Sequence, residues 1–118
     1  MTDLNIETLM DLLPQLFRPD QARGINAVIN FELSGDQGGI WSLSIHDQKC
    51  VVNQARSDHP DLTLHARDKD ILDIFTGRLS ASRAVLLRRL RMSGDMSLAM
   101  KILGLFNTDD PRLRQWRQ

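Results

Sequence analysis

Apolar residues recur every three or four positions between residues 4 and 17, the spacing typical of one face of an amphipathic helix. Pro14 lies within this stretch and cannot donate a backbone hydrogen bond, so we expect a break or kink near Leu13. Pro19 can open a short helical turn, which Gly24 would end. The first part of the chain is therefore predicted to be helical.

The pattern then changes to an alternation with a period of two, which is typical of half-buried strands. Residues 25–33 alternate, and residues 34–39 contain the glycines of a hairpin turn. Residues 41–46 alternate again, and shorter apolar stretches follow at 50–53 and 62–66. These ranges predict an antiparallel meander with one apolar face.

The second half of the chain returns to helical spacing. Asp68 can cap a helix that ends at Gly77, and Ser80 can cap a short helix that follows it. Residues 90–93 alternate and predict a fifth strand, and Gly94 and Asp95 turn the chain into a final helix. Strands followed by helices predict an α+β domain with the helices packed on one face of the sheet.

The final predicted helix, residues 95–106, is apolar around most of its circumference. Between Met96 and Phe106 its polar or glycine positions are Ser97, Lys101 and Gly104, which form one thin stripe. A helix of this kind must be covered over most of its surface. Either it lies at the centre of the core, or part of it faces a bound apolar ligand.

Composition limits the alternatives. The chain has 118 residues, enough for one domain with its own core, and 15 basic residues balance 15 acidic ones. This balance gives no reason to expect nucleic acid or an anionic membrane as a partner. No secretory signal or membrane-spanning run is visible in the sequence, so we expect a cytoplasmic protein. We predict a single domain over 1–118, with its core in 18–106 and a polar, basic tail in 107–118.

No catalytic or metal-binding constellation is evident. Ser57, Asp58 and His59 are the residue types of a hydrolase triad, but their adjacency in one polar loop argues against that role. The histidines have no metal-ligand spacing, and Cys50 has no cysteine partner. The sequence therefore predicts neither a catalytic residue nor a metal or other cofactor.

The basic residues are concentrated in one part of the chain, at Arg78, Arg83, Arg88, Arg89 and Arg91. No aromatic residues interleave with them, which disfavours nucleic acid. They can form a solvated face or contact acidic lipid headgroups or a partner protein. The last residues, 112–117, carry Trp116 between arginines, and two interpretations stay open: a frayed terminus, or a segment that docks on a partner or a membrane surface.

Several short motifs follow one another in a characteristic order and spacing. They span about residues 18–106 and are Pro19-Asp-Gln-Ala-Arg-Gly24, Phe31-Glu-Leu-Ser-Gly35, Gly38-Gly-Ile-Trp-Ser-Leu-Ser-Ile45, Pro60-Asp-Leu-Thr-Leu64, Phe75-Thr-Gly-Arg-Leu79, Ala84, Leu90-Arg-Met-Ser-Gly-Asp95 and Leu98-Ala-Met-Lys-Ile102. In this order the chain resembles the sterol carrier protein 2 family in its small, bacterial, single-domain form. The resemblance implies a five-stranded, mostly antiparallel sheet with helices on one face, enclosing a hydrophobic tunnel. It also implies a protein that is not an enzyme and that binds, and in some members transfers, sterols, fatty acyl chains or isoprenoids.

Carried over by position, the resemblance implies a tunnel wall of twelve residues: Phe31, Leu33, Trp41, Leu43, Ile45, Leu64, Phe75, Leu87, Met92, Met96, Met100 and Leu103. The chain departs from the family pattern at Arg88, where many members have glycine, and in its first helix. The run Arg88-Arg-Leu-Arg91 also resembles accessory factors of bacterial ubiquinone synthesis. An alternative function is therefore an accessory module that presents polyprenyl lipids to partner enzymes, with Arg88, Arg89 and Arg91 meeting the partner or a membrane.

Overall fold

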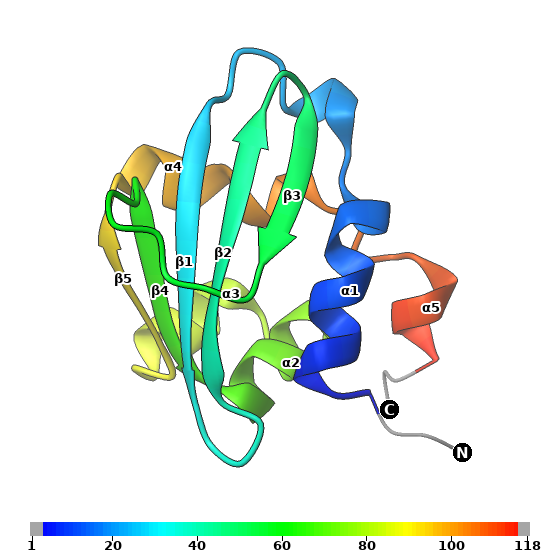
Figure 1. The fold of residues 1–118 in the computed structure, drawn as a ribbon. Helices are drawn as coiled ribbons and strands as arrows, with labels where there is room; N and C mark the ends of the chain where they lie inside the picture. The colour runs from blue at the N-terminus through cyan, green and yellow to red at the C-terminus, as the bar shows by residue number, and fades with distance from the viewer. Residues whose placement is uncertain (1–3, 116–118) are drawn as a thin grey trace.

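The structure, a computed structural model, describes residues 4–115 as one sheet with helices on one of its faces (Figure 1). The five strands lie in the order β3-β2-β1-β4-β5. Their bounds are β1 Ala27–Ser34, β2 Gly39–His46, β3 Lys49–Asn53, β4 Leu62–Arg67 and β5 Leu90–Gly94. The predicted α+β class, with five strands and helices on one face, is confirmed.

The predicted meander is correct for three strands and wrong for the fourth. Strands β1, β2 and β3 pair antiparallel, but β4 pairs with β1 in parallel, and β5 pairs antiparallel with β4. The reason is the loop of residues 54–61, which crosses the sheet on the face opposite the helices (Figure 1). This crossing brings β4 to the far side of β1, so the sheet is mixed rather than a continuous meander.

Asn30 in β1 holds the crossing loop against the sheet. Its side-chain amide donates to the carbonyl of Ser57 at 3.0 Å, and its Oδ1 accepts from the Ser57 backbone N–H at 3.0 Å. The Asn30 side chain is buried although it lies on the outer face of the sheet. One side chain thus pairs with the loop as a neighbouring strand would.

The first helix, α1 (Ile6–Leu16), continues through Pro14, so of the break or kink expected near Leu13, the break is wrong. Asn5 caps the helix by accepting from the Thr8 N–H at 2.8 Å. Pro14 is exposed and lies in the last turn, where little helix remains to be disrupted. The apolar face of the helix is buried, and this packing offsets the lost hydrogen bond; its members are Ile6, Leu9, Met10, Leu13 and Leu16.

The expected turn at Pro19 is a short 3-10 helix, η1 (Pro19–Gln21). Helix α2 (Asp68–Thr76) begins one residue before the predicted position, because Arg67 and not Asp68 occupies the capping position. The Asp68 carboxylate instead accepts from the backbone N–H groups of Gln37 and Lys69, at 2.9 and 2.8 Å. It thereby ties the β1–β2 turn to the start of α2.

The next two capping predictions are confirmed. Gly77 ends α2 in the left-handed conformation, with φ of 85°. Ser80 caps α3 (Ala81–Leu86) by accepting from the Arg83 N–H at 3.1 Å.

The apolar helix predicted over residues 95–106 is divided into two elements. Asp95 caps α4 (Met96–Lys101), and a 3-10 helix, η2 (Ile102–Leu105), follows directly. The segment predicted as a polar tail then forms one further turn, α5 (Pro111–Arg114), whose Leu113 is completely buried. The docking or fraying of Trp116 lies outside the described residues.

Aromatic side chains join the helical layer at its centre. The ring of Phe106 lies 5.8 Å from that of Phe17 and 6.2 Å from that of Phe75, edge to face in both pairs. These contacts join the end of α1, the end of η2 and helix α2. Within residues 4–115, no helix is long and apolar enough to cross a membrane.

Candidate functional site: an apolar cavity behind the sheet

A cavity of about 620 Å³ lies between the sheet and helices α2, α3 and α4. Pockets of this size accommodate small organic ligands. Ser82 is the one polar residue of its lining, which consists of Phe31, Leu64, Ile71, Ile74, Phe75, Ala81, Ser82, Val85, Leu90, Met92, Met96, Ala99, Met100, Ile102 and Leu103. The cavity offers a ligand apolar surface and almost no hydrogen-bonding group.

The floor of the cavity follows from the register of three strands. Phe31 of β1 lies opposite Leu64 of β4, and Leu64 lies opposite Met92 of β5. Residues that are paired in this way point to the same face of a sheet. Alternation along the strands therefore places one continuous apolar row beneath the cavity.

The walls of the cavity are formed by helical segments, and the final one is apolar on two sides. In the final helical segment, Leu98 and Leu105 are buried in the core, whereas Met96, Met100 and Leu103 line the cavity. The exposed fraction of Met100 is 89% and that of Met96 is 48%, so both residues lie where the cavity opens to solvent. One side of this segment therefore packs in the core, and the other side lines the cavity.

Seven of the twelve residues expected from the resemblance are brought together in the cavity lining: Phe31, Leu64, Phe75, Met92, Met96, Met100 and Leu103. The structure places the other five elsewhere. Leu43 and Ile45 are buried in the core, and Leu87 is half exposed in the turn after α3. Leu33 borders a basic cleft, and Trp41 borders a small polar hollow beside Asn5 and Gln37.

Helix α1 packs against β3, on the side of the sheet that carries Trp41, Leu43 and Ile45. The cavity lies on the same face of the sheet, toward the edge formed by β4 and β5. Sequence reasoning missed eight lining residues: Ile71, Ile74, Ala81, Ser82, Val85, Leu90, Ala99 and Ile102. Helical periodicity in α2 and α3 was the available signal, but it marks a buried face without showing what that face touches.

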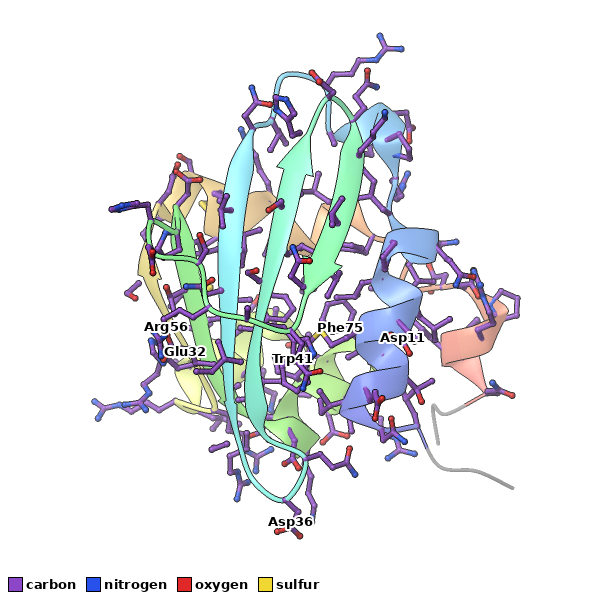
Figure 2. The ribbon with its side chains drawn as sticks, viewed as in Figure 1. Asp11, Glu32, Asp36, Trp41, Arg56 and Phe75 are labelled. Atoms are coloured by element: carbon purple, nitrogen blue, oxygen red, sulfur yellow. The ribbon has the colours of Figure 1, made fainter. Side chains whose placement is uncertain are left out.

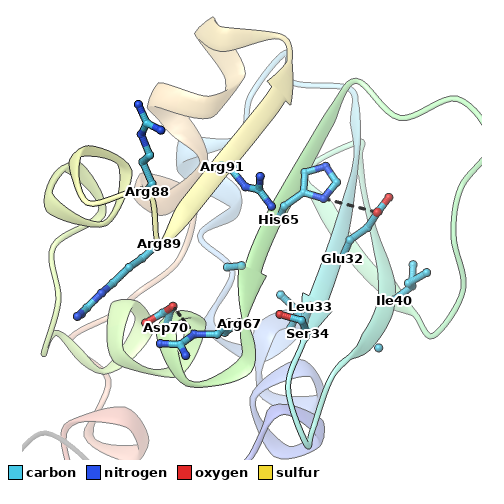
Figure 3. A pocket seen from close by; sticks show the side chains of 12 residues that line it. Glu32, Leu33, Ser34, Ile40, His65, Arg67, Asp70, Arg88, Arg89 and Arg91 are labelled. Carbon is cyan, nitrogen blue, oxygen red and sulfur yellow. Dashed lines mark hydrogen bonds and ion pairs between the residues drawn. The ribbon is translucent and has the colours of Figure 1, made fainter.

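A second, basic cleft of about 740 Å³ lies on the outer face of the sheet near the α3–β5 turn (Figure 3). Glu32 forms an ion pair with Arg56, and its carboxylate lies 3.6 Å from Nδ1 of His65. Glu32 and Arg56 lie side by side on this face, whereas Phe75 lies behind the sheet (Figure 2). The same cleft is bordered by Arg67, Arg88, Arg89 and Arg91.

The side chains considered for catalysis in the sequence do not form a catalytic arrangement in the described residues. The backbone of Ser57 is held by Asn30, and Asp58 and His59 are exposed in the crossing loop. Burial raises the pKa of the Cys50 thiol to about 12, so it is protonated and weakly nucleophilic at neutral pH. The described residues contain no group of three or more histidine, cysteine or acidic side chains placed to hold a metal ion.

The chain matches one part of longer curated proteins. Hydroxysteroid dehydrogenase-like protein 2 of Homo sapiens is 28% identical over 109 residues. The match covers 92% of this chain and 26% of that protein. The chain therefore spans about a quarter of the length of this relative.

Solved structures share the fold. Sterol Carrier Protein 2 from Yarrowia lipolytica, in its apo form, superposes with a TM-score of 0.68 at 18% identity, over 88% of this chain and 91% of that one. UbiJ-SCP2, described as a ubiquinone synthesis protein, gives a TM-score of 0.64 at 19% identity, over 88% and 90%. At these identities the likeness concerns the fold.

The family model described as the SCP-2 sterol transfer family matches residues 6–107, which include the sheet and all elements that line the cavity. The chain belongs to the SCP-2 sterol transfer family.

Proposed function

We propose that the chain binds one apolar lipid in the cavity between the sheet and helices α2 to α4, and releases it to membranes or to other proteins. The observation that carries this proposal is an apolar cavity of about 620 Å³ inside a domain of this family. A protein that used the fold only for protein contacts would have no need of such a cavity.

The lining favours broad ligand selectivity. Burial of about 300 Å² of a lipid tail contributes roughly 7–8 kcal/mol before the entropy of association is subtracted, and any apolar tail of this size contributes the same. The flexible thioethers of Met92, Met96 and Met100 can repack around ligands of different shape. With Ser82 as the one polar lining residue, the headgroup contributes little to recognition inside the cavity.

The proposed role is carriage without catalysis, because no arrangement of nucleophile and base borders the cavity in the part of the chain described here. An accessory role beside partner enzymes, such as enzymes that act on isoprenoid quinones, is the second candidate. It is favoured by the fold shared with UbiJ-SCP2. The cytoplasmic location expected from the sequence stays a prediction.

The test is displacement of a fluorescent fatty acid, cis-parinaric acid, from the purified full chain, together with mass spectrometry of lipids extracted from the native protein. Ala99→Phe places a ring in the cavity, and we expect it to weaken binding at least tenfold while thermal unfolding stays cooperative. Ala81→Phe provides a second cavity variant from a different helix. Any loss of probe binding in these variants would come from the added volume, because the alanine that is replaced makes little contact with a ligand.

The matched control is Ala55→Phe, the same substitution at an exposed position of the crossing loop, which we expect to bind the probe as the wild type does. Absence of both extracted lipid and probe binding in the wild type would contradict lipid carriage. If the wild type and both folded cavity variants bound the probe equally, the ligand would bind outside the cavity.

A further inference from the structure

Large apolar side chains are exposed around the opening of the cavity. Among the described residues, the exposed large hydrophobics other than Val51 all lie between residues 85 and 100. They are Val85, Leu86, Leu87, Met96 and Met100, of which Leu86 is 81% and Met100 89% exposed. Val85, Met96 and Met100 also line the cavity, so the exposed apolar surface continues into it. Contiguous exposed apolar surface of this kind marks a contact with another apolar phase.

The charge of the chain is separated along its length, and the positive surplus lies in the segment that carries these exposed apolar residues. Residues 77–106 contain six basic side chains and one acidic one, a surplus of five positive charges. The whole chain has no net charge, so the remaining residues carry five excess negative charges. A chain that is neutral as a whole therefore has a strongly basic segment, and this segment includes α3, β5 and α4, which contribute residues to the cavity lining.

The arginines of the α3–β5 turn are available for external contacts. Arg88 has a left-handed backbone conformation with φ of 60°, and Arg88 and Arg89 extend away from the ribbon in different directions (Figure 3). The ion pairs formed within residues 4–115 do not include Arg88, Arg89 or Arg91. Their charges are not neutralised by carboxylates of the described residues.

We propose that this surface, which we call the mouth surface and define as the exposed side chains of residues 83–89 and 96–101, docks on an anionic lipid bilayer. Leu86 and Met100 enter the headgroup region, and Arg88 and Arg89 contact the phosphates. The cavity then opens directly on the hydrocarbon, and a lipid tail enters it without crossing water. This inference rests on the proposed lipid-binding function and adds the surface through which the cavity is loaded.

A bilayer fits this surface better than a protein partner does. It offers negative charge at the level of the headgroups and apolar material below it, which complement Arg88 and Arg89 of the α3–β5 turn and the exposed apolar side chains beside them. Apolar side chains flanked by basic residues are typical of proteins that bind at the membrane interface. The apolar groups insert between the headgroups, and the basic groups are attracted to anionic lipids. The neutral total charge keeps such docking reversible, because the acidic remainder of the chain is repelled by the same membrane.

The experiment measures flotation of the full chain with vesicles of phosphatidylcholine alone or with 30% phosphatidylglycerol. We expect binding to the anionic vesicles that falls as salt is raised, and little binding to the neutral ones. Each basic residue near an anionic surface changes the partition coefficient roughly fivefold, so Arg88→Gln with Arg89→Gln lowers binding about 25-fold. Leu86→Ser weakens binding to the same vesicles at every salt concentration.

Matched controls lie elsewhere on the chain. Arg18→Gln with Arg23→Gln removes two exposed arginines outside the mouth surface, and Val51→Ser removes an exposed apolar side chain from β3. We expect both to bind vesicles as the wild type does. Losses equal to those of the mouth variants would overturn the assignment, and so would a wild type that does not float with anionic vesicles.

Binding of cis-parinaric acid without vesicles separates the two proposals. The Arg88→Gln, Arg89→Gln variant retains probe binding if only docking is affected, whereas failure of the wild type to bind the probe refutes lipid carriage and leaves the vesicle result to stand by itself. Light scattering after size exclusion tests a second copy of the chain as occupant. A wild-type dimer that Leu86→Ser converts to a monomer, with vesicle binding unchanged, would contradict the proposal.

Discussion

At the scale of the residue, a few polar side chains decide the path of the chain. Asn30 is buried beneath the crossing loop and pairs with both backbone groups of Ser57. Asp68 joins the β1–β2 turn to α2 in a similar way, through the Gln37 N–H. These residues lie on the strands and helices that frame the cavity, but they do not line it.

We expect Asn30→Ala to lower the free energy of unfolding by about 1–3 kcal/mol, because the N–H and carbonyl of Ser57 lose their partner. Urea denaturation measures this change. The control is Asn53→Ala on the exposed end of β3, which should stay within about 0.5 kcal/mol of the wild type. A small effect of Asn30→Ala would mean that water replaces the side chain and that the loop is not held by it.

At the scale of the element, packing overrides local propensity. Helix α1 continues through Pro14 because five of its apolar residues are buried, although proline disfavours a helix interior. The final apolar segment shows the converse. Its pattern suits one long helix, yet it divides into α4 and η2, and its two sides meet the core and the cavity.

Replacement of Pro14 by alanine restores a backbone donor in the last turn of α1 and removes the contact of the proline ring with the preceding turn. We predict a free energy of unfolding higher by about 1–3 kcal/mol, as judged from urea denaturation. Asp11→Ala, one turn earlier on the exposed side, serves as the comparison and should change stability little. An unchanged or lower stability for Pro14→Ala would show that α1 is arranged around the proline.

At the scale of the whole molecule, the apolar cavity couples stability to ligand. The cavity lies between the sheet and three helices, so a bound lipid replaces missing packing between the two layers. A ligand that binds the folded state alone stabilises it according to its concentration relative to Kd. Folding and lipid carriage therefore depend on the same apolar surface.

A saturating fatty acid should accordingly raise the unfolding free energy by about 2.7 kcal/mol at 100 times its Kd. For a chain of this size we expect an increase in Tm of roughly ten degrees in scanning calorimetry. At the same fatty-acid concentration, Ala99→Phe should show about half of this increase or less, because its binding is at least tenfold weaker, whereas Ala55→Phe should show the full one. Equal increases in all three proteins would indicate that the fatty acid binds outside the cavity.

Much of the fold could be read from the chain. Period-two alternation located the strands, and Ser80 and Gly77 marked helix ends correctly, because these signals depend on neighbours in sequence. The parallel pairing of β1 with β4 could not be read in this way, since it depends on where a polar loop crosses the sheet. The start of α2 was also misplaced, because the carboxylate of Asp68 serves a distant turn.

The candidate site divides in the same manner. The sequence by itself determined that the domain is α+β, that its last helical segment is apolar around most of its circumference, and that its basic residues are concentrated in one region, because spacing and charge are local properties. Only the tertiary structure decided that the cavity lies toward β4 and β5, without Trp41, Leu43 and Ile45 in its lining. The physical reason is that alternation shows which face of a strand is apolar, whereas the packing of α1 and the path of the crossing loop decide whether that face meets a helix or an open cavity.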